Sequence, residues 1–329
     1  MKKVKNYLSF IKFSHTIFAM PFALIGFFLA LKQFNFFQKR PSCDCIVPVK
    51  IMFFDSALDD ADKSRGVLHD YLQGHDVYFI MTKYLCLVIL CMIFARSAAM
   101  AFNRYLDRKF DAKNPRTAIR EIPSGIITPK NALIFTIANC LLFVACCFFI
   151  NRLCFYLSPV ALAVVLGYSY TKRFTPLCHL ILGLGLSLAP IGAYLAVTGV
   201  FHLLPILFSL AVLFWVSGFD IIYALQDEEF DKSQQLYSIP AWLGKKKALR
   251  VSELLHLFSA AAILYAGYFG HFGWLYWAGS ATFIGMLIYQ HTIVKPTDLR
   301  RVNLAFMTAN GIASVVFAIF VIADLFINK

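Results

Sequence analysis

Acidic residues are scarce in this chain, and most of those outside one polar loop fall in two short segments. The chain has 18 Asp and Glu residues among 329, and seven of them lie in the loop Asn35–Asp76. Eight of the other eleven lie within residues 103–121 and 220–231. Each segment adjoins a long apolar run. Because carboxylates at the ends of membrane helices are costly and usually functional, these two clusters are the strongest candidates for chemistry.

The spacing within each cluster places its polar groups on one face of a helix. The intervals are four residues in the first cluster and three or four in the second, for Asn103, Asp107 and Asp111, and for Asp220, Tyr223, Asp227 and Asp231. Two facing rows of carboxylates would repel each other unless a cation lay between them. Mg²⁺ fits, because it is a hard ion that takes oxygen ligands from carboxylates and substrate phosphates. Asn103 would add a neutral oxygen.

Basic residues lie beside these acids. Arg116 and Arg120 follow the first cluster, and Lys172 and Arg173 end another apolar run. Such side chains can bind the oxygens of a diphosphate, and Arg can do so with two parallel hydrogen bonds. Together with the apolar interior described next, this combination points to a polyprenyl diphosphate substrate whose headgroup stays at the membrane surface.

The composition predicts an all-α integral membrane protein. Hydrophobic residues make up 60% of the chain and charged residues 15%, against about 25% charged in a soluble domain. Nine apolar runs have roughly the length of a bilayer crossing: His15–Leu31, Tyr78–Ala101, Ala132–Ile150, Phe155–Tyr170, His179–Val197, Leu203–Phe219, Leu254–Gly270, Phe272–Tyr289 and Val302–Ile327. We therefore expect a single domain, residues 1–329, of about nine transmembrane helices, and we interpret the first run as a membrane helix rather than a cleaved signal peptide.

The distribution of basic residues predicts the orientation. With the N-terminus inside, the inner segments hold 21 Lys and Arg residues and the outer segments hold 8. The net charge of +13 then reports topology, and it argues against nucleic acid as a partner. Four crossings separate the two acidic clusters, which form a weak internal repeat, so both should lie at the cytoplasmic face. We expect a multi-pass protein of the inner (cytoplasmic) membrane.

The polar segment Asn35–Asp76 is interpreted as a long, flexible outer loop. Its acidic residues show no spacing on one helix face, so a solvated loop is favoured over a metal site. Cys43 and Cys45 are interpreted as two unconnected thiols, although a Cys-x-Cys pair could also bind a metal or form a strained disulfide.

Three motifs in order resemble those of the UbiA-type membrane prenyltransferases, in particular the 4-hydroxybenzoate polyprenyltransferase branch. They are an N-x-x-x-D-x-x-x-D pattern at Asn103–Asp111, a Y-S-Y-T-K-R pattern at Tyr168–Arg173, and a D-x-x-Y-A-x-x-D-x-x-x-D pattern at Asp220–Asp231. The resemblance covers the whole chain except Asn35–Asp76. Two departures are that long loop and Glu121, which stands where the family often has Pro.

The resemblance implies a Mg²⁺-dependent transfer of a prenyl group from its diphosphate to an acceptor in quinone biosynthesis. It implies a Mg²⁺–diphosphate site formed by Asn103, Asp107, Asp111, Asp220, Asp227 and Asp231. It implies phosphate contacts from Arg116, Lys172 and Arg173. Catalytic roles are expected for Asp107, Asp111, Asp227, Asp231 and Tyr223.

We expect the prenyl diphosphate to ionise and a phenol ring to attack the resulting allylic cation. The acceptor, a 4-hydroxybenzoate-like acid, needs a cation for its carboxylate, and Lys12 and His15 at the start of the first helix are candidates. They could equally flank and cap that helix.

Other functions remain open. The acceptor could be a dihydroxynaphthoate or a non-aromatic lipid precursor. A CDP-alcohol phosphotransferase also uses membrane carboxylates, but the D-x-x-D-G pattern of that class is absent. In a transporter, acids usually lie near the membrane midplane at broken helices, whereas these acids lie at helix ends beside basic loops.

Overall fold

A computed structural model describes residues 6–7, 9–11, 18–33 and 77–328 of the chain. The predicted outer loop, with Cys43 and Cys45, lies outside these residues. The described elements are all helical, which confirms the predicted class: α2 (Met20–Gln33), α4 (Val77–Asp111), α5 (Pro129–Ile150), α6 (Arg152–Thr171), α7 (Cys178–Thr198), α8 (Leu203–Ala224), η2 (Leu225–Asp227), α9 (Glu228–Ser233), α10 (Ile239–Phe269), α11 (Trp274–Ile293), η3 (Leu304–Ala309) and α12 (Asn310–Ile327).

Within the described part of the chain, seven helical segments are long and apolar enough to cross a membrane. α2 is a shorter apolar helix of 14 residues, and α11 has 20 residues but is not among the seven. The predicted count of nine crossings therefore stays a prediction.

Several helices extend beyond their apolar runs. α4 continues to Asp111, so Asn103 and Asp107 lie on its last turns, as the helical spacing predicted. α10 begins at Ile239, well before the predicted start at Leu254. Apolar runs mark only the part of a helix that faces lipid or core, and the polar ends of these helices reach past it.

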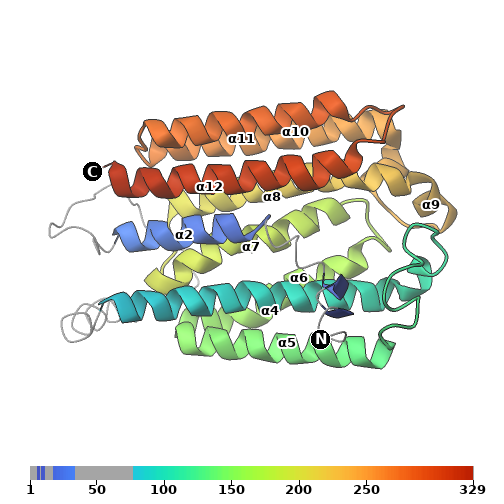
Figure 1. Ribbon diagram of the computed structural model, residues 1–329, viewed down its shortest axis with the longest axis horizontal. Coiled ribbons are helices and arrows are strands. Elements are labelled where there is room, and N and C mark those ends of the chain that lie inside the picture. The colour runs from blue at the N-terminus through green and yellow to red at the C-terminus, as the bar shows by residue number, and fades with distance from the viewer. Residues whose placement is uncertain (1–5, 8, 12–17, 34–76, 329) are drawn as a thin grey trace.

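The helices lie side by side along the long axis of the molecule (Figure 1). α10 and α11 form one edge, α4 and α5 form the other, and α2, α7 and α8 lie between them. Nine of the 14 residues of α2 are buried, and Phe22 packs against Trp215, Phe283 and Phe317. The core is thus an aromatic cluster around α2.

Close approach of α2 to α7 requires a glycine. A Cβ atom added to Gly26 would lie 2.0 Å from the carbonyl oxygen of Pro190, a distance at which atoms overlap. Small residues let membrane helices pack at short range. Gly26 therefore fixes how α2 sits against α7.

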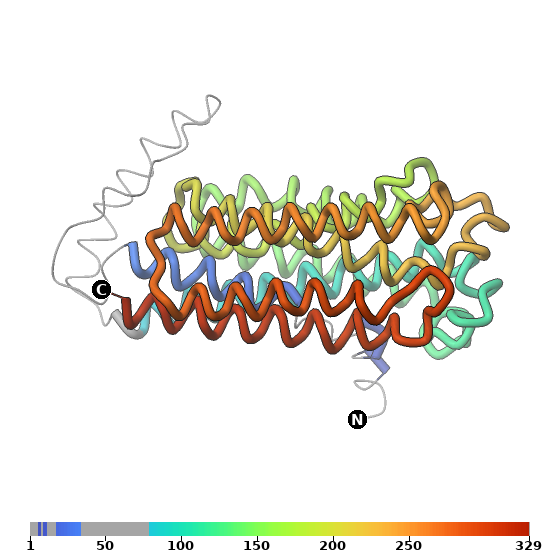
Figure 2. The backbone as a smooth tube through the Cα atoms, turned by 90° about the horizontal axis from the view of Figure 1, so that it is seen from above, coloured from blue at the N-terminus to red at the C-terminus, as the bar shows by residue number. Residues whose placement is uncertain are grey.

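The segments that follow α4 and α8 lie at the same end of the bundle (Figures 1 and 2). After α8 the chain forms the short turn η2 and then α9, and α10 starts at the N-cap Ser238, whose hydroxyl accepts from the backbone N–H of Ala241 at 3.2 Å. This end of the bundle carries both acidic clusters.

Candidate active site

The two acidic clusters meet in one pocket of about 300 Å³ at this end of the bundle. It is lined by ten of the residues that the sequence singled out: Asn103, Asp107, Asp111, Arg116, Lys172, Arg173, Asp220, Tyr223, Asp227 and Asp231. We call it the polar pocket. Lys12 and His15, the predicted partners of the acceptor carboxylate, lie outside the described residues.

On α4, the carboxylates are held by Arg side chains from two other parts of the chain. Asp107 accepts from Arg173, which follows α6, at 2.8 Å. It also accepts from the amide of Asn103 at 3.1 Å. Arg120, in the segment after α4, donates to both oxygens of Asp111 at 2.8 and 2.9 Å. These contacts tie α4 to α6 and to its own following segment.

At the end of α8, Arg116 joins Asp227 and Tyr223. Its guanidinium donates to the two oxygens of Asp227 at 3.1 and 2.5 Å and to the hydroxyl of Tyr223 at 3.2 Å. Asn114 donates to Asp227 at 3.3 Å. Although burial lowers the pKa of Arg116, its contact with Asp227 raises that pKa above the ordinary value. The guanidinium is therefore charged at any physiological pH.

Asp231 is buried completely and is held from two sides. Lys172 lies 2.7 Å from one of its oxygens, and the hydroxyl of Ser238 donates to the other at 2.9 Å. Burial lowers the pKa of Lys172, but the contact with Asp231 raises it above the ordinary value. Because a buried carboxylate without a partner is very costly, α9 must fold back toward the end of α6.

The residues of the polar pocket fit Mg²⁺ by the chemistry of their donors. Five carboxylates and two Asn side chains line one cavity, and oxygen donors of this kind suit a hard cation. Within the residues that the structure describes, however, no three His, Cys, Asp or Glu side chains form a ready-made metal site. Each carboxylate instead contacts a basic side chain. Four of these basic groups, all except the partner of Asp220, are among those that the sequence suggested for binding phosphate.

Arg104 and Glu121 form an ion pair that the sequence did not indicate. Arg104, one of the 21 basic residues of the inner segments, is buried and donates to Glu121. Glu121 also accepts from the hydroxyl of Ser9 at 2.7 Å. The departure from the family pattern at Glu121 is thus part of a buried ion pair that holds the segment after α4 against that helix.

His179 and Arg96 also belong to the polar pocket and were missed. His179 opens α7, and its Nδ1 lies 2.6 Å from an oxygen of Asp220. Arg96 lies inside the apolar run of α4, and its buried Nε has no hydrogen-bond partner in the described structure. The sequence could have identified Arg96, because a charged residue within a membrane helix is a functional candidate by default.

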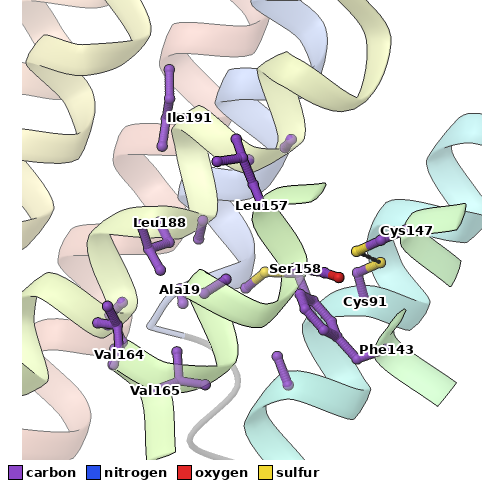
Figure 3. A pocket seen from close by; sticks show the side chains of 18 of the residues that line it. Ala19, Cys91, Phe143, Cys147, Leu157, Ser158, Val164, Val165, Leu188 and Ile191 are labelled. Atoms are coloured by element: carbon purple, nitrogen blue, oxygen red, sulfur yellow. Dashed lines mark hydrogen bonds between the residues drawn. The ribbon is translucent and has the colours of Figure 1, made fainter. Parts of the chain in front are cut away.

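A second cavity of about 360 Å³ adjoins the polar pocket and is almost entirely apolar. Its wall comes mainly from α4, α5, α6 and α7, with Ala19 just before α2, and Figure 3 shows Cys91, Phe143, Cys147, Leu157 and Leu188 around it. The two cavities share five lining residues, which are Arg96, Met100, Tyr168, Leu182 and Leu186. We call this second space the apolar cavity. The charged polar pocket therefore adjoins an apolar cavity inside the bundle.

A family model, described as the UbiA prenyltransferase family, matches residues 74–312. The chain belongs to this family. It is 31% identical over 242 residues to a protein of Nitrosomonas europaea named 4-hydroxybenzoate octaprenyltransferase, covering 74% of this chain and 82% of that protein. A protein of the same name from Nitrosospira multiformis is 29% identical, covering 71% and 80% of the two chains.

Solved structures of the family share the fold. The apo structure of a UbiA homolog from Aeropyrum pernix superposes with a TM-score of 0.69 at 26% identity, covering 95% of this chain and 98% of that one. A UbiA homolog from Archaeoglobus fulgidus, described as bound to DMAPP and Mg²⁺, gives a TM-score of 0.65 at 20% identity, covering 98% and 99%. The family, the all-helical membrane fold and the prenyltransferase class predicted from the motifs are thereby confirmed.

Proposed function

We propose that this protein transfers a polyprenyl group from polyprenyl diphosphate to a 4-hydroxybenzoate-like aromatic acid, with release of diphosphate, in quinone biosynthesis. The observation that carries the proposal is the direct junction of the polar pocket with the apolar cavity. A substrate with a charged head and a long hydrocarbon tail fits such a junction. The names of the relatives support the aromatic acceptor.

In this proposal the polar pocket holds the diphosphate. Arg116, Lys172 and Arg173 exchange their carboxylate partners for phosphate oxygens, which Arg can bind in a bidentate manner. Mg²⁺, when bound, would neutralise charge on the departing diphosphate. The residues that would hold it are Asn103, Asp107, Asp111, Asp220, Asp227 and Asp231.

The apolar cavity holds the prenyl chain and keeps water from the reaction. Its lining is hydrocarbon and sulfur apart from a few polar groups such as Ser158 and Arg96. An allylic cation formed beside it meets no bulk water, so capture by the acceptor is favoured over hydrolysis.

Arg96 is the described residue best placed to bind the carboxylate of the acceptor. It lines both cavities, so it lies where the head and the tail of the donor meet. Its guanidinium lies within an apolar run, and the described part of the chain supplies no carboxylate within ion-pair distance. The carboxylate of the acceptor would supply the missing partner of the Arg96 guanidinium. Lys12 and His15 keep this role as a prediction.

The bond changes are then simple. The C–O bond at the first carbon of the prenyl chain breaks, and its electron pair leaves with the diphosphate. The ring carbon ortho to the phenol hydroxyl forms the new C–C bond. The ring proton passes to the diphosphate or to a carboxylate of the polar pocket, which restores the aromatic ring.

The test is to incubate membranes containing the chain with a prenyl diphosphate and a panel of hydroxybenzoates and dihydroxynaphthoates, and to identify the product by mass. Asp107→Asn and Asp227→Asn should each lower prenyl transfer by about 10²–10³-fold or more, because each removes charge that stabilises the transition state. Asp298→Asn, which changes an exposed carboxylate that pairs with Arg300 and does not line the pocket, is the control. Near wild-type transfer by both pocket variants would contradict the site, and a dihydroxynaphthoate product would reassign the acceptor.

A further inference from the structure

The last membrane helix is irregular where it passes the polar pocket. Leu304–Ala309 forms the π-helical segment η3 ahead of α12. π-Helical turns are rare and occur frequently at functional sites, because the wider turn redirects its side chains. One member of this turn, Phe306, lines the polar pocket. The irregular turn therefore coincides with the site.

A buried amide holds this turn in position. Asn310 is fully buried, and its Nδ2 donates to the carbonyls of Ala305 at 3.1 Å and Phe306 at 3.0 Å. Its Oδ1 accepts from Trp215 Nε1 at 2.8 Å and from Gln290 Nε2 at 2.9 Å. Every hydrogen-bonding position of the amide is used, and the partners come from α8, α11 and η3. The orientation of Phe306 is thus fixed by a network that lies outside the pocket.

Phe306 belongs to a group of four aromatic rings that line the polar pocket, which we call the aromatic wall: Phe18, Phe219, Tyr223 and Phe306. The ring centroids of Phe306 and Tyr223 are 4.3 Å apart with an interplanar angle of 32°. Phe306 also meets Phe18 at 5.3 Å and Phe219 at 5.5 Å, edge to face. Tyr223 is therefore backed by packed aromatic rings.

The exposed part of this wall adjoins the groups expected to bind diphosphate. The guanidinium carbon of Arg116 lies 5.6 Å from the centroid of the Tyr223 ring, and the same guanidinium binds the Tyr223 hydroxyl. Tyr223 thus already interacts with a positive charge through its ring. When Arg116 turns toward phosphate oxygens, that part of the ring becomes available to another cation.

We propose that the aromatic wall stabilises the positive charge that forms on the prenyl chain as diphosphate departs, through the rings of Tyr223 and Phe306, with Asn310 as a positioning residue for the Phe306 ring. The proposal rests on the proposed function. When the C–O bond breaks, the electron pair goes to the diphosphate and the allylic carbon is left positive, one bond from the leaving group. The negative face of an aromatic ring attracts a cation, more strongly where water is excluded.

The experiment replaces Phe306 by phenylalanines carrying one, two and three ring fluorines, in the full-length chain in membranes. Fluorine weakens the negative face of the ring while its size changes little. With geranyl diphosphate and 4-hydroxybenzoate as probes, kcat should fall stepwise with each fluorine while KM for the diphosphate stays within about twofold. Phe306→Leu should lower kcat by about five- to thirtyfold, the range of a partly desolvated cation–π contact.

Two controls separate charge stabilisation from packing. Phe317→Leu removes a fully buried ring of α12 that does not line the polar pocket, so it reports the effect of lost packing alone. Asn310→Leu should reproduce the loss of kcat seen for Phe306→Leu, because it frees the π-helical turn. A flat fluorine series in an active enzyme would overturn the aromatic proposal alone, whereas no diphosphate release by the wild-type chain would contradict the proposed function as well.

Discussion

At the scale of the residue, the polar pocket is a set of matched charges. Each of its five carboxylates contacts a basic side chain, for example Asp107 with Arg173 and Asp231 with Lys172. Removing one member of a buried pair leaves the other charge unpaired, which costs several kcal/mol. The pairs therefore keep the pocket folded without a ligand, and the same cations are available when a phosphate group enters.

Arg96 differs from these residues because it has no acidic partner among the described residues. We predict that Arg96→Gln raises KM for 4-hydroxybenzoate by about tenfold or more, since a charge-assisted hydrogen bond to the acceptor is lost. The release of diphosphate in the absence of acceptor should change much less. The measurement is steady-state kinetics with the acceptor varied.

The methyl ester of 4-hydroxybenzoate is the matched control, because it removes the same charge from the other side. If Arg96 binds the carboxylate, the ester should be a poor acceptor for the wild type and should lose little more with Arg96→Gln. An equal loss for acid and ester would assign Arg96 a structural role instead.

At the scale of the element, the sequence predicted the helices and the positions of the acidic clusters, but not how the ends of the helices fold. Intervals of four residues placed Asn103, Asp107 and Asp111 on one face correctly, because they belong to one regular helix, α4. The fold of α9, which buries Asp231 against Lys172, depends on contacts between distant segments that no local spacing encodes.

The sequence did not predict the π-helical turn η3 or a role for Arg96, and each omission has a physical reason. The π-helical turn η3 is mostly apolar, like any membrane helix. Its position depends on the distant side chains of Trp215 and Gln290, which contact Asn310. Arg96 was overlooked because basic residues were assigned to loops when the orientation was predicted. A basic residue within an apolar run is the exception to that assignment.

The contact between α2 and α7 gives a prediction on stability. Gly26→Ala should destabilise the protein by about 1–3 kcal/mol, because the added methyl group overlaps the backbone of Pro190 and the helices must separate. Thermal unfolding in detergent should show a lower midpoint. Gly285→Ala on α11 meets no atom within 4 Å and should be neutral or slightly stabilising. Equal midpoints for Gly26→Ala and the wild type would contradict the close packing of α2.

At the scale of the whole molecule, the apolar cavity extends from the polar pocket into the bundle and should set the length of the prenyl chain that fits. Cys91 and Cys147 face each other across its wall from α4 and α5, with their sulfur atoms 3.9 Å apart (Figure 3). We predict that Cys147→Trp fills part of the cavity and shifts the preference toward shorter prenyl diphosphates. Competition between geranyl and longer diphosphates measures this shift, and Cys140→Trp, outside the cavity lining, is the control.

If Cys147→Trp and Cys140→Trp gave the same distribution of products, the prenyl chain would have to lie elsewhere in the bundle. A general loss of activity at every chain length would indicate a folding defect, which the thermal midpoint of the purified variant identifies separately.

The orientation of the molecule gives the last prediction. The basic residues of the inner segments predict that the N-terminus and both acidic clusters lie in the cytoplasm, and the predicted nine crossings would place the C-terminus outside. The side chain of Glu229, on α9 beside the polar pocket, is 93% exposed. In cells carrying the chain with Cys43 and Cys45 changed to Ser, Glu229→Cys should react with a membrane-impermeant maleimide only after the inner membrane is permeabilised. With Glu229 left unchanged, the native Cys43 and Cys45 of the predicted outer loop should react in intact cells. The reverse labelling pattern would contradict the predicted orientation. It would place the diphosphate site at the outer face of the membrane, where a substrate made in the cytoplasm could not reach it directly.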